Sequence, residues 1–226
     1  MPSPTGIKRH HVIDNDMIKI LDEFFSLTDW KGLYLSGGTC IAEFYFGHRV
    51  SVDLDLFTQD AGLFEEAGRV LKKHDLFSVG TVEITRTMPA FCQYLVHRKN
   101  KLPIKLDLIH DIPVCLAKKI FFENIWLDSL PDLVANKLGC LIQRSDVKDY
   151  LDLYYLLPEI NLPLDKLIEL GQKKDAGLDP LILAHQLSYI QTVRQRPKIF
   201  LTNTPFKQIQ NFFGYWRKEI LDFVKA

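Results

Sequence analysis

The pattern of apolar residues changes once along the chain, near residue 126, and this change limits the possible folds strongly. Before it, short apolar runs rich in β-branched and aromatic residues predict strands at 32–36, 52–57, 79–86, 91–98 and 104–109. After it, nearly every segment has apolar residues at spacings of three and four, which predicts helices. We therefore expect an α/β unit over residues 1–126 and a helical unit over residues 127–226.

The composition narrows the class of protein. Of the 226 residues, 47% are hydrophobic and 25% are charged, values that are ordinary for a globular chain with a buried core. The 28 basic and 28 acidic residues balance, which excludes a cationic nucleic-acid-binding surface over the whole chain. No apolar run is long enough for a membrane span and no secretory signal is visible, so we expect no membrane partner. The widely spaced cysteines are typical of free thiols in the cytoplasm rather than of a zinc knuckle.

Two aspartates lie on the predicted strand at 52–57. Because side chains alternate along a strand, Asp53 and Asp55 point the same way, about 7 Å apart, and Val52, Leu54 and Leu56 form an apolar face on the other side. Two negative charges this close repel each other unless a cation lies between them, and Mg²⁺ prefers carboxylate oxygens. The pair is a candidate metal site, although a half-exposed strand with a charged outer face would have the same pattern.

A glycine pair, Gly37 and Gly38, follows the first predicted strand and precedes a helical stretch. Glycine lets the backbone approach a phosphate closely, and the N–H groups at the start of a helix favour anions. A plain tight turn would use the same pair. Because only one short helix separates the pair from the strand with two aspartates, we expect the turn and the carboxylates at the same edge of a sheet.

A third aspartate, Asp107, lies in the predicted strand at 104–109. Aspartate is depleted in strands, so three aspartates at strand centres in one unit suggest a role beyond packing. We expect Asp53, Asp55 and Asp107 to converge. Two carboxylates for one ion, with a third that completes a two-metal arrangement or activates an acceptor hydroxyl, is the logic of phosphoryl and nucleotidyl transfer.

The helical unit carries polar residues in two places. On the predicted helix at 130–144, Lys137 and Arg144 lie at the margin of an apolar stripe, where each either faces a phosphate or extends its stem over the core with its charge in water. The next helix is apolar nearly all round, and Asp149 and Asp152 lie on its remaining polar strip. That strip faces either a ligand or bulk water.

Residues 36–57, SGGTCIAEFYFGHRVSVDLDLF, closely resemble the first signature of the AbiEii-type nucleotidyltransferases, toxins of bacterial abortive-infection and toxin–antitoxin systems. Asp107 falls where that family's later strand carboxylate is expected. Residues 132–144 and 148–154 are similar to two helical motifs of the family, so the resemblance covers roughly residues 32–157. The matching positions are Gly37, Gly38, His48, Arg49, Ser51, Asp53, Asp55, Phe57, Asp132, Lys137 and Arg144.

The resemblance implies an α+β fold: a DNA polymerase β-like nucleotidyltransferase lobe with a mixed sheet, followed by an all-helical C-terminal lobe. It also implies transfer of a nucleotidyl group from a nucleoside triphosphate (NTP), with Mg²⁺ or Mn²⁺ as cofactor. Asp152 would orient Lys137 or contact the nucleotide. Asp53, Asp55 and Asp107 would bind the metal, and the residues that would hold the triphosphate are Gly37, Gly38, Thr39, Arg49, Ser51 and Lys137.

The acceptor and the partners are less constrained. We expect the acceptor to be an RNA such as tRNA, a protein or a small molecule, and a slight excess of basic residues after residue 158, interleaved with aromatic residues, favours RNA. The resemblance also implies a cognate antitoxin. The alternative is a non-catalytic module that binds nucleotide or a partner protein on a nucleotidyltransferase-like scaffold. The intact aspartate pair argues against it, because a pure binder needs no clustered carboxylates.

Overall fold

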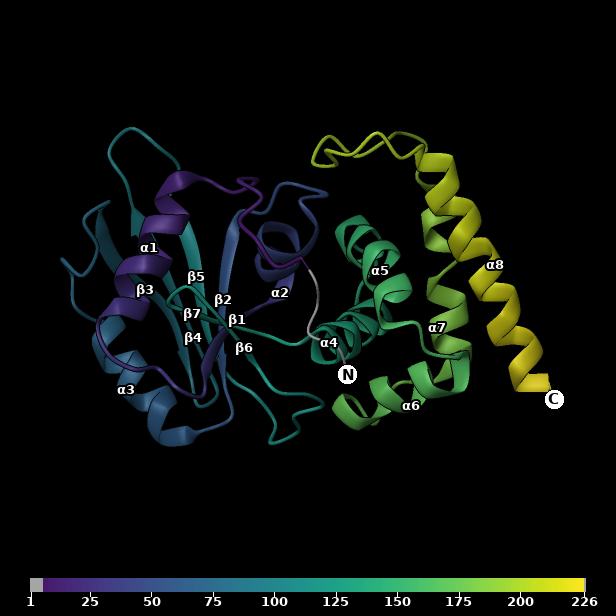
Figure 1. The fold of residues 1–226 in the computed structure, drawn as a ribbon, viewed down its shortest axis with the longest axis horizontal. Helices are drawn as coiled ribbons and strands as arrows, with labels where there is room; N and C mark the ends of the chain where they lie inside the picture. The colour runs from purple at the N-terminus through teal and green to yellow at the C-terminus, as the bar shows by residue number, and fades with distance from the viewer. Residues whose placement is uncertain (1–5, 226) are drawn as a thin grey trace. The chain divides into compact units, whose positions relative to one another are not determined.

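The computed structural model describes residues 6–225, and the chain divides into two compact units, Met1–Ser129 and Leu130–Ala226. Their helices and strands are labelled in Figure 1. The first unit contains α1 (Asn15–Ser26), β1 (Leu33–Ser36), α2 (Gly37–Thr39), the π-helix η1 (Cys40–Phe46), β2 (Asp53–Thr58), α3 (Ala61–Leu71), β3 (Thr81–Met88), β4 (Phe91–His97), β5 (Ile104–His110), β6 (Ile120–Phe122) and β7 (Ile125–Leu127). The second unit contains α4 (Leu130–Gln143), α5 (Val147–Ile160), α6 (Leu164–Lys174), α7 (Pro180–Gln186), the 3₁₀-helix η2 (Tyr189–Thr192) and α8 (Phe206–Lys225). No helix among the described residues is long and apolar enough to cross a bilayer.

Within residues 6–225, seven strands form one mixed sheet in the order β3-β4-β5-β2-β1-β7-β6. β2 pairs in parallel with β5 and β1 pairs in parallel with β7, whereas the other neighbours are antiparallel. The mixed sheet and the helices after it confirm the predicted α+β class. The five strands predicted from the sequence are β1 to β5. β6 and β7 have three residues each, too few to show an alternating pattern.

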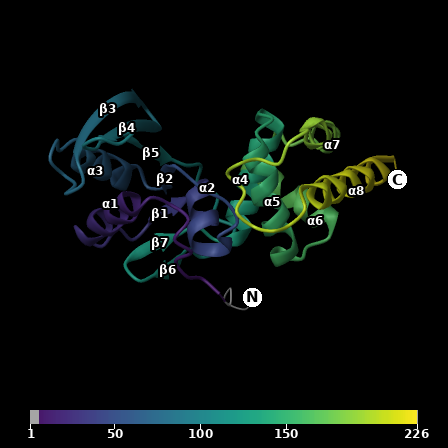
Figure 2. The ribbon, with the colours of Figure 1, turned by 90° about the horizontal axis from the view of Figure 1, so that it is seen from above.

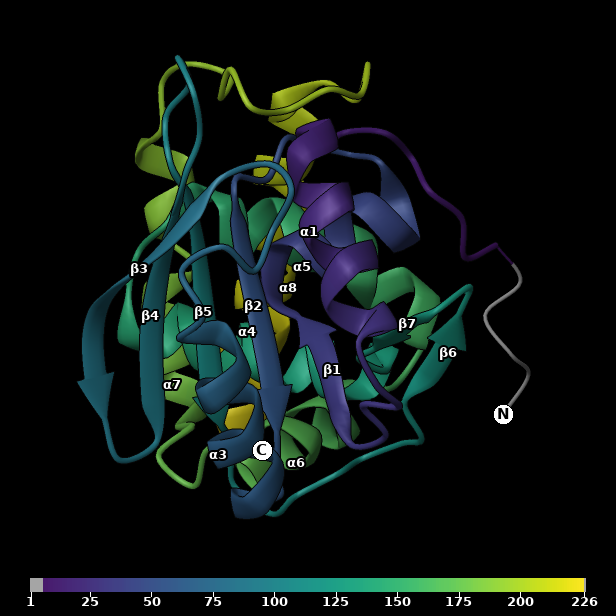
Figure 3. The ribbon, with the colours of Figure 1, turned by 90° about the vertical axis from the view of Figure 1, so that its left-hand side faces the viewer.

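The two faces of the sheet have different partners. α1 and α3 cover one face, as Figure 3 shows, and α2 lies on the other face in Figure 1. Leu108 of β5 lies next to α3, and its register partner Leu56 of β2 is equally buried on the same face. Because side chains alternate, the aspartates of these strands point to the opposite face.

The loop that leads into the sheet is anchored by an aromatic pair. α1 begins after Asp14, whose carboxylate accepts a hydrogen bond from the backbone N–H of Asp16. After the helix, the Trp30 ring stacks on Phe24 with ring centroids 4.8 Å apart. The indole N–H of Trp30 donates to the Phe24 carbonyl oxygen at 2.8 Å. These contacts fix the approach of the chain to β1.

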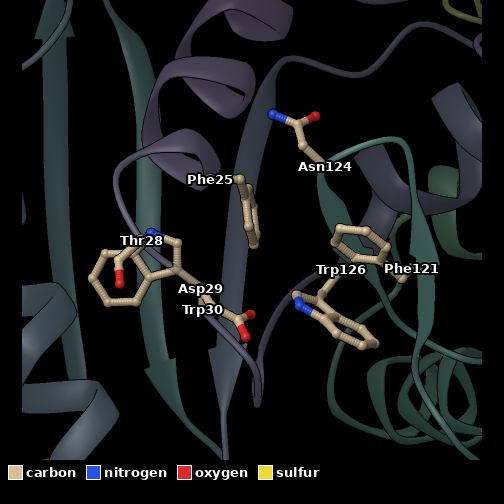
Figure 4. A pocket seen from close by; sticks show the side chains of 7 residues that line it. All are labelled: Phe25, Thr28, Asp29, Trp30, Phe121, Asn124 and Trp126. Carbon is tan, nitrogen blue, oxygen red and sulfur yellow. The ribbon is translucent and has the colours of Figure 1, made fainter.

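A cavity of about 210 Å³ lies between the end of α1 and the β6–β7 hairpin. Figure 4 shows its lining, in which Phe25, Trp30, Phe121 and Trp126 supply aromatic walls. None of the described residues around it is one that the sequence analysis assigns to the site. The candidate site therefore has to be sought on the strands themselves.

The helices of the second unit pack around α4 and α5. α4 contacts α5, α6 and α7, and α8 contacts α7 and α5 (Figure 2). α5 begins after Asp146, whose carboxylate accepts a hydrogen bond from the backbone N–H of Lys148. Tyr150 of α5 is fully buried and meets Phe213 of α8 edge to face, with ring centroids 5.4 Å apart. The apolar surface of α5 is thus covered by neighbouring helices.

We predict that Trp30→Ala lowers the free energy of unfolding by about 3–5 kcal/mol, because it removes a buried ring and leaves a cavity. Trp30 is 1% exposed. Tyr215→Ala is the control, since that ring is 66% exposed and its loss is expected to cost about 0.5 kcal/mol or less. Urea unfolding of both variants measures the difference. Equal losses of unfolding free energy in the two variants would contradict the assignment of Trp30 to the core.

Candidate active site

The parallel pairing of β2 with β5 brings three aspartates together. In this register Asp53 lies opposite Lys105, and Asp55 lies opposite Asp107. Residues that are register partners point to the same face of a sheet, so Asp53, Asp55 and Asp107 share one face. The Asp53 side chain is 31% exposed and the Asp107 side chain 10% exposed. The carboxylates therefore form a partly open acidic cluster above a buried apolar layer.

Lys105 offsets part of the negative charge of this cluster. Its ammonium Nζ lies 3.0 Å from Oδ2 of Asp107 and 3.5 Å from Oδ2 of Asp53. Burial disfavours the charged ammonium, but the hydrogen bond to Asp107 and the nearby carboxylates outweigh burial and raise the pKa of Lys105. On the other side, Nε2 of Gln93 in β4 donates to Oδ1 of Asp107 at 3.0 Å. No role for Lys105 or Gln93 was predicted from the sequence. The signal for Lys105 was its spacing of two from Asp107, which puts both on one face.

The chemistry of these side chains fits a hard divalent cation. Carboxylate oxygens are the ligands that Mg²⁺ prefers, and three carboxylates point to one face of two neighbouring strands. Among residues 6–225, however, no three His, Cys, Asp or Glu side chains are grouped as a metal site. The Lys105 ammonium instead contacts Asp53 and Asp107. Asp53, Asp55 and Asp107 would hold the metal ion, which would take the place of the Lys105 ammonium.

The glycine turn lies directly beside the carboxylates. Ser36, the last residue of β1, is the register partner of Asp55. Gly37 has φ +68°, and a Cβ atom there would collide with the Asp55 carboxylate. A Cβ atom on Gly38 would collide with the Arg49 guanidinium. The backbone conformation therefore favours glycine at position 37, and a side chain at either position would have to displace the end of the Asp55 or the Arg49 side chain.

The other residues that the sequence analysis assigns to the triphosphate lie in the same region. Thr39 Oγ1 lies 2.9 Å from Ser51 Oγ and also donates to the backbone carbonyl of Asp53. Arg49 is 2% exposed, and its Nη1 donates to the Val50 carbonyl oxygen at 2.9 Å. A buried guanidinium packed against Gly38 places positive charge beside the glycine turn. The buried Thr39 and Ser51 hydroxyls thus lie next to the Asp53 backbone, and the buried Arg49 guanidinium lies next to the turn.

Lys137 of α4 is buried within the second unit. Its Nζ lies 2.7 Å from Oδ1 of Asp149 and 2.7 Å from Oδ2 of Asp152, both on α5. Arg144 Nε donates to Oδ2 of Asp149 at 2.8 Å. Burial raises the pKa of the Asp149 carboxyl, but Lys137 and Arg144 outweigh burial and hold it below its usual range. Asp149 and Asp152 are fully buried and Lys137 is 5% exposed, so the alternatives that placed these charges in bulk water are wrong.

Comparisons with known proteins identify a family for nearly the whole chain. A sequence model of the family described as nucleotidyl transferase AbiEii toxin, type IV toxin–antitoxin system, matches residues 19–224. An uncharacterized protein of Aquifex aeolicus is 28% identical over 89% of this chain and 94% of its own length.

Two solved structures share the fold. The protein JHP933 from Helicobacter pylori has a TM-score of 0.58 at 16% identity, covering 93% of this chain and 91% of its own. The nucleotidyltransferase toxin MenT4 from Mycobacterium tuberculosis has a TM-score of 0.60 at 14% identity, covering 91% of this chain and 83% of its own. At these identities the likeness establishes a common architecture over nearly the whole chain.

We predict that Lys137→Met lowers the free energy of unfolding by about 3–5 kcal/mol, because it removes the one buried ammonium that contacts both Asp149 and Asp152. Arg144→Met is the matched control. It removes a partner of the same Asp149, but the Arg144 side chain is 50% exposed, so we expect a loss of about 1 kcal/mol or less. Urea unfolding at neutral pH measures both. A small, equal loss in the two variants would mean that the Lys137 ion pairs do not stabilise the fold.

Proposed function

The chain belongs to the AbiEii nucleotidyltransferase toxin family of type IV toxin–antitoxin systems, and we propose that it transfers a nucleotidyl group from an NTP to an acceptor with Mg²⁺ or Mn²⁺ as cofactor. One observation carries the proposal: Asp53, Asp55 and Asp107 share a face of the sheet next to the Gly37 turn. Nucleotidyl transfer requires carboxylates that hold metal ions next to the place where the phosphates bind.

In this reaction an oxygen of the acceptor forms a bond to the α-phosphorus of the NTP. The bond from that phosphorus to its bridging oxygen breaks, and pyrophosphate leaves. Asp107 takes the proton of the acceptor hydroxyl, or would help to hold a second metal ion. A metal ion bound by Asp53, Asp55 and Asp107 would supply charge stabilisation to the phosphate oxygens.

In this proposal the glycine turn and the side chains next to it bind the triphosphate. Gly37 and Gly38 let the backbone approach the phosphates, and the N–H groups at the start of α2 favour their negative charge. The Arg49 guanidinium, packed against Gly38, adds a positive charge. The Thr39 and Ser51 hydroxyls, 2.9 Å apart, add hydrogen bonds that orient the phosphates.

For Lys137 we propose a contact with the phosphate charge that develops during transfer, with Asp152 as the group that orients the lysine ammonium. The 2.7 Å ion pair between Lys137 and Asp152 supports the orienting role. The acceptor is an RNA such as tRNA, a protein or a small molecule. A cognate antitoxin is expected as a partner because the family consists of toxins of toxin–antitoxin systems.

The second candidate function is a non-catalytic module that binds nucleotide or a partner protein. It is favoured by the position of Lys105, whose ammonium forms ion pairs with both Asp53 and Asp107. A lysine in this place would suit a site that never binds a metal ion. Calorimetric titration with NTP, with and without Mg²⁺, separates the two functions, because metal-independent binding without turnover favours the module.

We predict that Asp53→Asn abolishes nucleotide transfer while lowering the free energy of unfolding by about 1 kcal/mol at most, since its ion pair with Lys105 is partly exposed. The substitution keeps the shape of the side chain and removes the charge offered to the metal. The purified protein is incubated with each of four α-labelled NTPs and with total cellular RNA and protein as acceptors. Transfer is measured as label incorporated into the acceptor. Asp75→Asn is the control, because the Asp75 side chain is 86% exposed and lies outside the site. Wild-type transfer by Asp53→Asn in Mg²⁺ would overturn the proposed mechanism.

We also predict that Lys105→Met strengthens binding of Mg²⁺ by about tenfold, because the competing ammonium is gone and the carboxylates repel each other without a cation. Binding raises the melting temperature by mass action, so the rise should begin at about tenfold lower Mg²⁺ concentration than in the wild type. Lys148→Met is the control, since its ion pair with Asp146 lies in the second unit. An unchanged Mg²⁺ dependence in Lys105→Met would refute competition between the lysine and the metal.

A further inference from the structure

Gln93 of β4 holds one oxygen of Asp107. The two residues are register partners, so their side chains share the face of the sheet that carries the aspartates. Nε2 of Gln93 donates to Oδ1 of Asp107 at 3.0 Å, and Nζ of Lys105 donates to Oδ2 at 3.0 Å. An ionised carboxylate only accepts hydrogen bonds, so the –NH₂ group of Gln93, rather than its carbonyl oxygen, faces Asp107. The two oxygens of Asp107 therefore have different partners, an uncharged amide at Oδ1 and an ammonium at Oδ2.

A β-bulge in the neighbouring edge strand orients the Gln93 amide. The register of β3 against β4 shifts between Ile84 and Arg86, so Thr85 is an extra residue of β3 that lies beside Gln93. Its Oγ1 lies 3.2 Å from Oε1 of Gln93 and 3.3 Å from the Gln93 backbone carbonyl oxygen. A hydroxyl that donates to Oε1 keeps the carbonyl end of the amide turned toward Thr85. The –NH₂ group at the other end is then turned toward Asp107.

The two partners of Asp107 differ in their response to a cation. The Lys105 ammonium is positively charged, so a divalent cation next to the carboxylates repels it. The Gln93 amide is uncharged, and it can keep its bond to Oδ1 while a cation binds at Oδ2. Hydrogen bonds of this kind orient the ligands of metal ions, and their removal typically costs about 10–100-fold in metal affinity or activity.

We propose that Gln93 is a positioning residue that holds Oδ1 of Asp107, with its own amide oriented by Thr85, and so presents Oδ2 to the metal ion once the Lys105 ammonium withdraws. This inference rests on the proposed function, because it assumes that Asp107 binds a metal ion. Gln93 itself touches neither the metal ion nor the nucleotide in this arrangement. Neither Gln93 nor Thr85 belongs to the sequence motifs on which the family resemblance rests.

The first test is calorimetric titration of the full chain with Mn²⁺, which measures binding without turnover. Gln93→Met keeps the length of the side chain and removes its N–H donor, so we expect the Kd for Mn²⁺ to rise about tenfold. Gln59→Met is the matched control, because the Gln59 amide donates instead to the backbone carbonyl oxygen of Val114 at 2.6 Å. The Kd of this control should equal that of the wild type. An unchanged Kd in Gln93→Met would overturn the inference.

The side-chain amide of Gln93 gives a spectroscopic readout that a merely structural role would not move. Its ¹⁵N–H resonances are identified by their absence in Gln93→Met. Addition of Mg²⁺ to the wild type should shift these resonances, because the carboxylate that the amide contacts then binds the ion. The shift should disappear in Asp53→Asn, which removes a ligand of the same ion. Resonances that stay in place while Mg²⁺ binds would overturn the inference.

Thr85→Val tests the orientation of the amide, and it keeps the inference testable should Gln93→Met fail to fold. Without the Thr85 hydroxyl, the Gln93 amide resonances should move even in the absence of metal. The Kd for Mn²⁺ should rise about two- to threefold, the effect of one weak hydrogen bond. Thr87→Val makes the same substitution at another exposed residue of β3 and should change neither quantity. Unchanged amide resonances in Thr85→Val would refute the orienting role of the bulge.

Failure of this inference and failure of the proposed function give different results. A wild type that binds neither Mn²⁺ nor Mg²⁺ would refute the proposed function. A wild type that binds Mn²⁺ with the same Kd as Gln93→Met and Thr85→Val would refute the role of Gln93 alone.

Discussion

The parallel pairing of β2 with β5 determines the rest of the candidate site. It places Asp55 opposite Asp107 and Asp53 opposite Lys105, so that the charges of two strands gather on one face. The same register buries Leu56 and Leu108 on the other face, and that apolar layer is what stabilises the pairing. A slip of one residue would bury the aspartates and expose the leucines. The acidic cluster is therefore fixed by the hydrophobic layer beneath it.

The close packing of the glycine turn follows from that cluster. Gly37 lies against the Asp55 carboxylate and Gly38 against the Arg49 guanidinium, so opposite charges adjoin the turn from two sides. Lys105 keeps the carboxylates from repelling each other in the free protein. Buried charges are tolerated in a protein when they are paired. In the second unit, the buried Lys137 is likewise paired with Asp149 and Asp152.

Much of the fold and part of the site follow from local sequence patterns. The alternation in 52–57 predicts that Asp53 and Asp55 share a face, and the glycine pair predicts the turn beside them. Local periodicity does not determine which strands become neighbours in a sheet. The contact of Lys105 with Asp53 on the next strand could therefore not be predicted. The hydrogen bond from Ser36 Oγ to Asp128, 92 residues away, could not be predicted for the same reason. Likewise, the sequence pattern predicted that Lys137 lies at the margin of an apolar stripe. The burial of Lys137 could not be predicted, because it depends on the packing of α5 against α4.

The central claim is that the three aspartates hold a divalent cation beside a triphosphate bound at the glycine turn. A crystal structure of the protein with Mn²⁺ and a non-hydrolysable NTP tests it directly, because anomalous scattering locates the metal ion. The account predicts a Mn²⁺ peak at the oxygens of Asp53 and Asp55, the triphosphate at Gly37 and Gly38, and the Lys105 ammonium withdrawn from Asp53. A nucleotide bound elsewhere, or no Mn²⁺ peak with Lys105 still between Asp53 and Asp107, would contradict it.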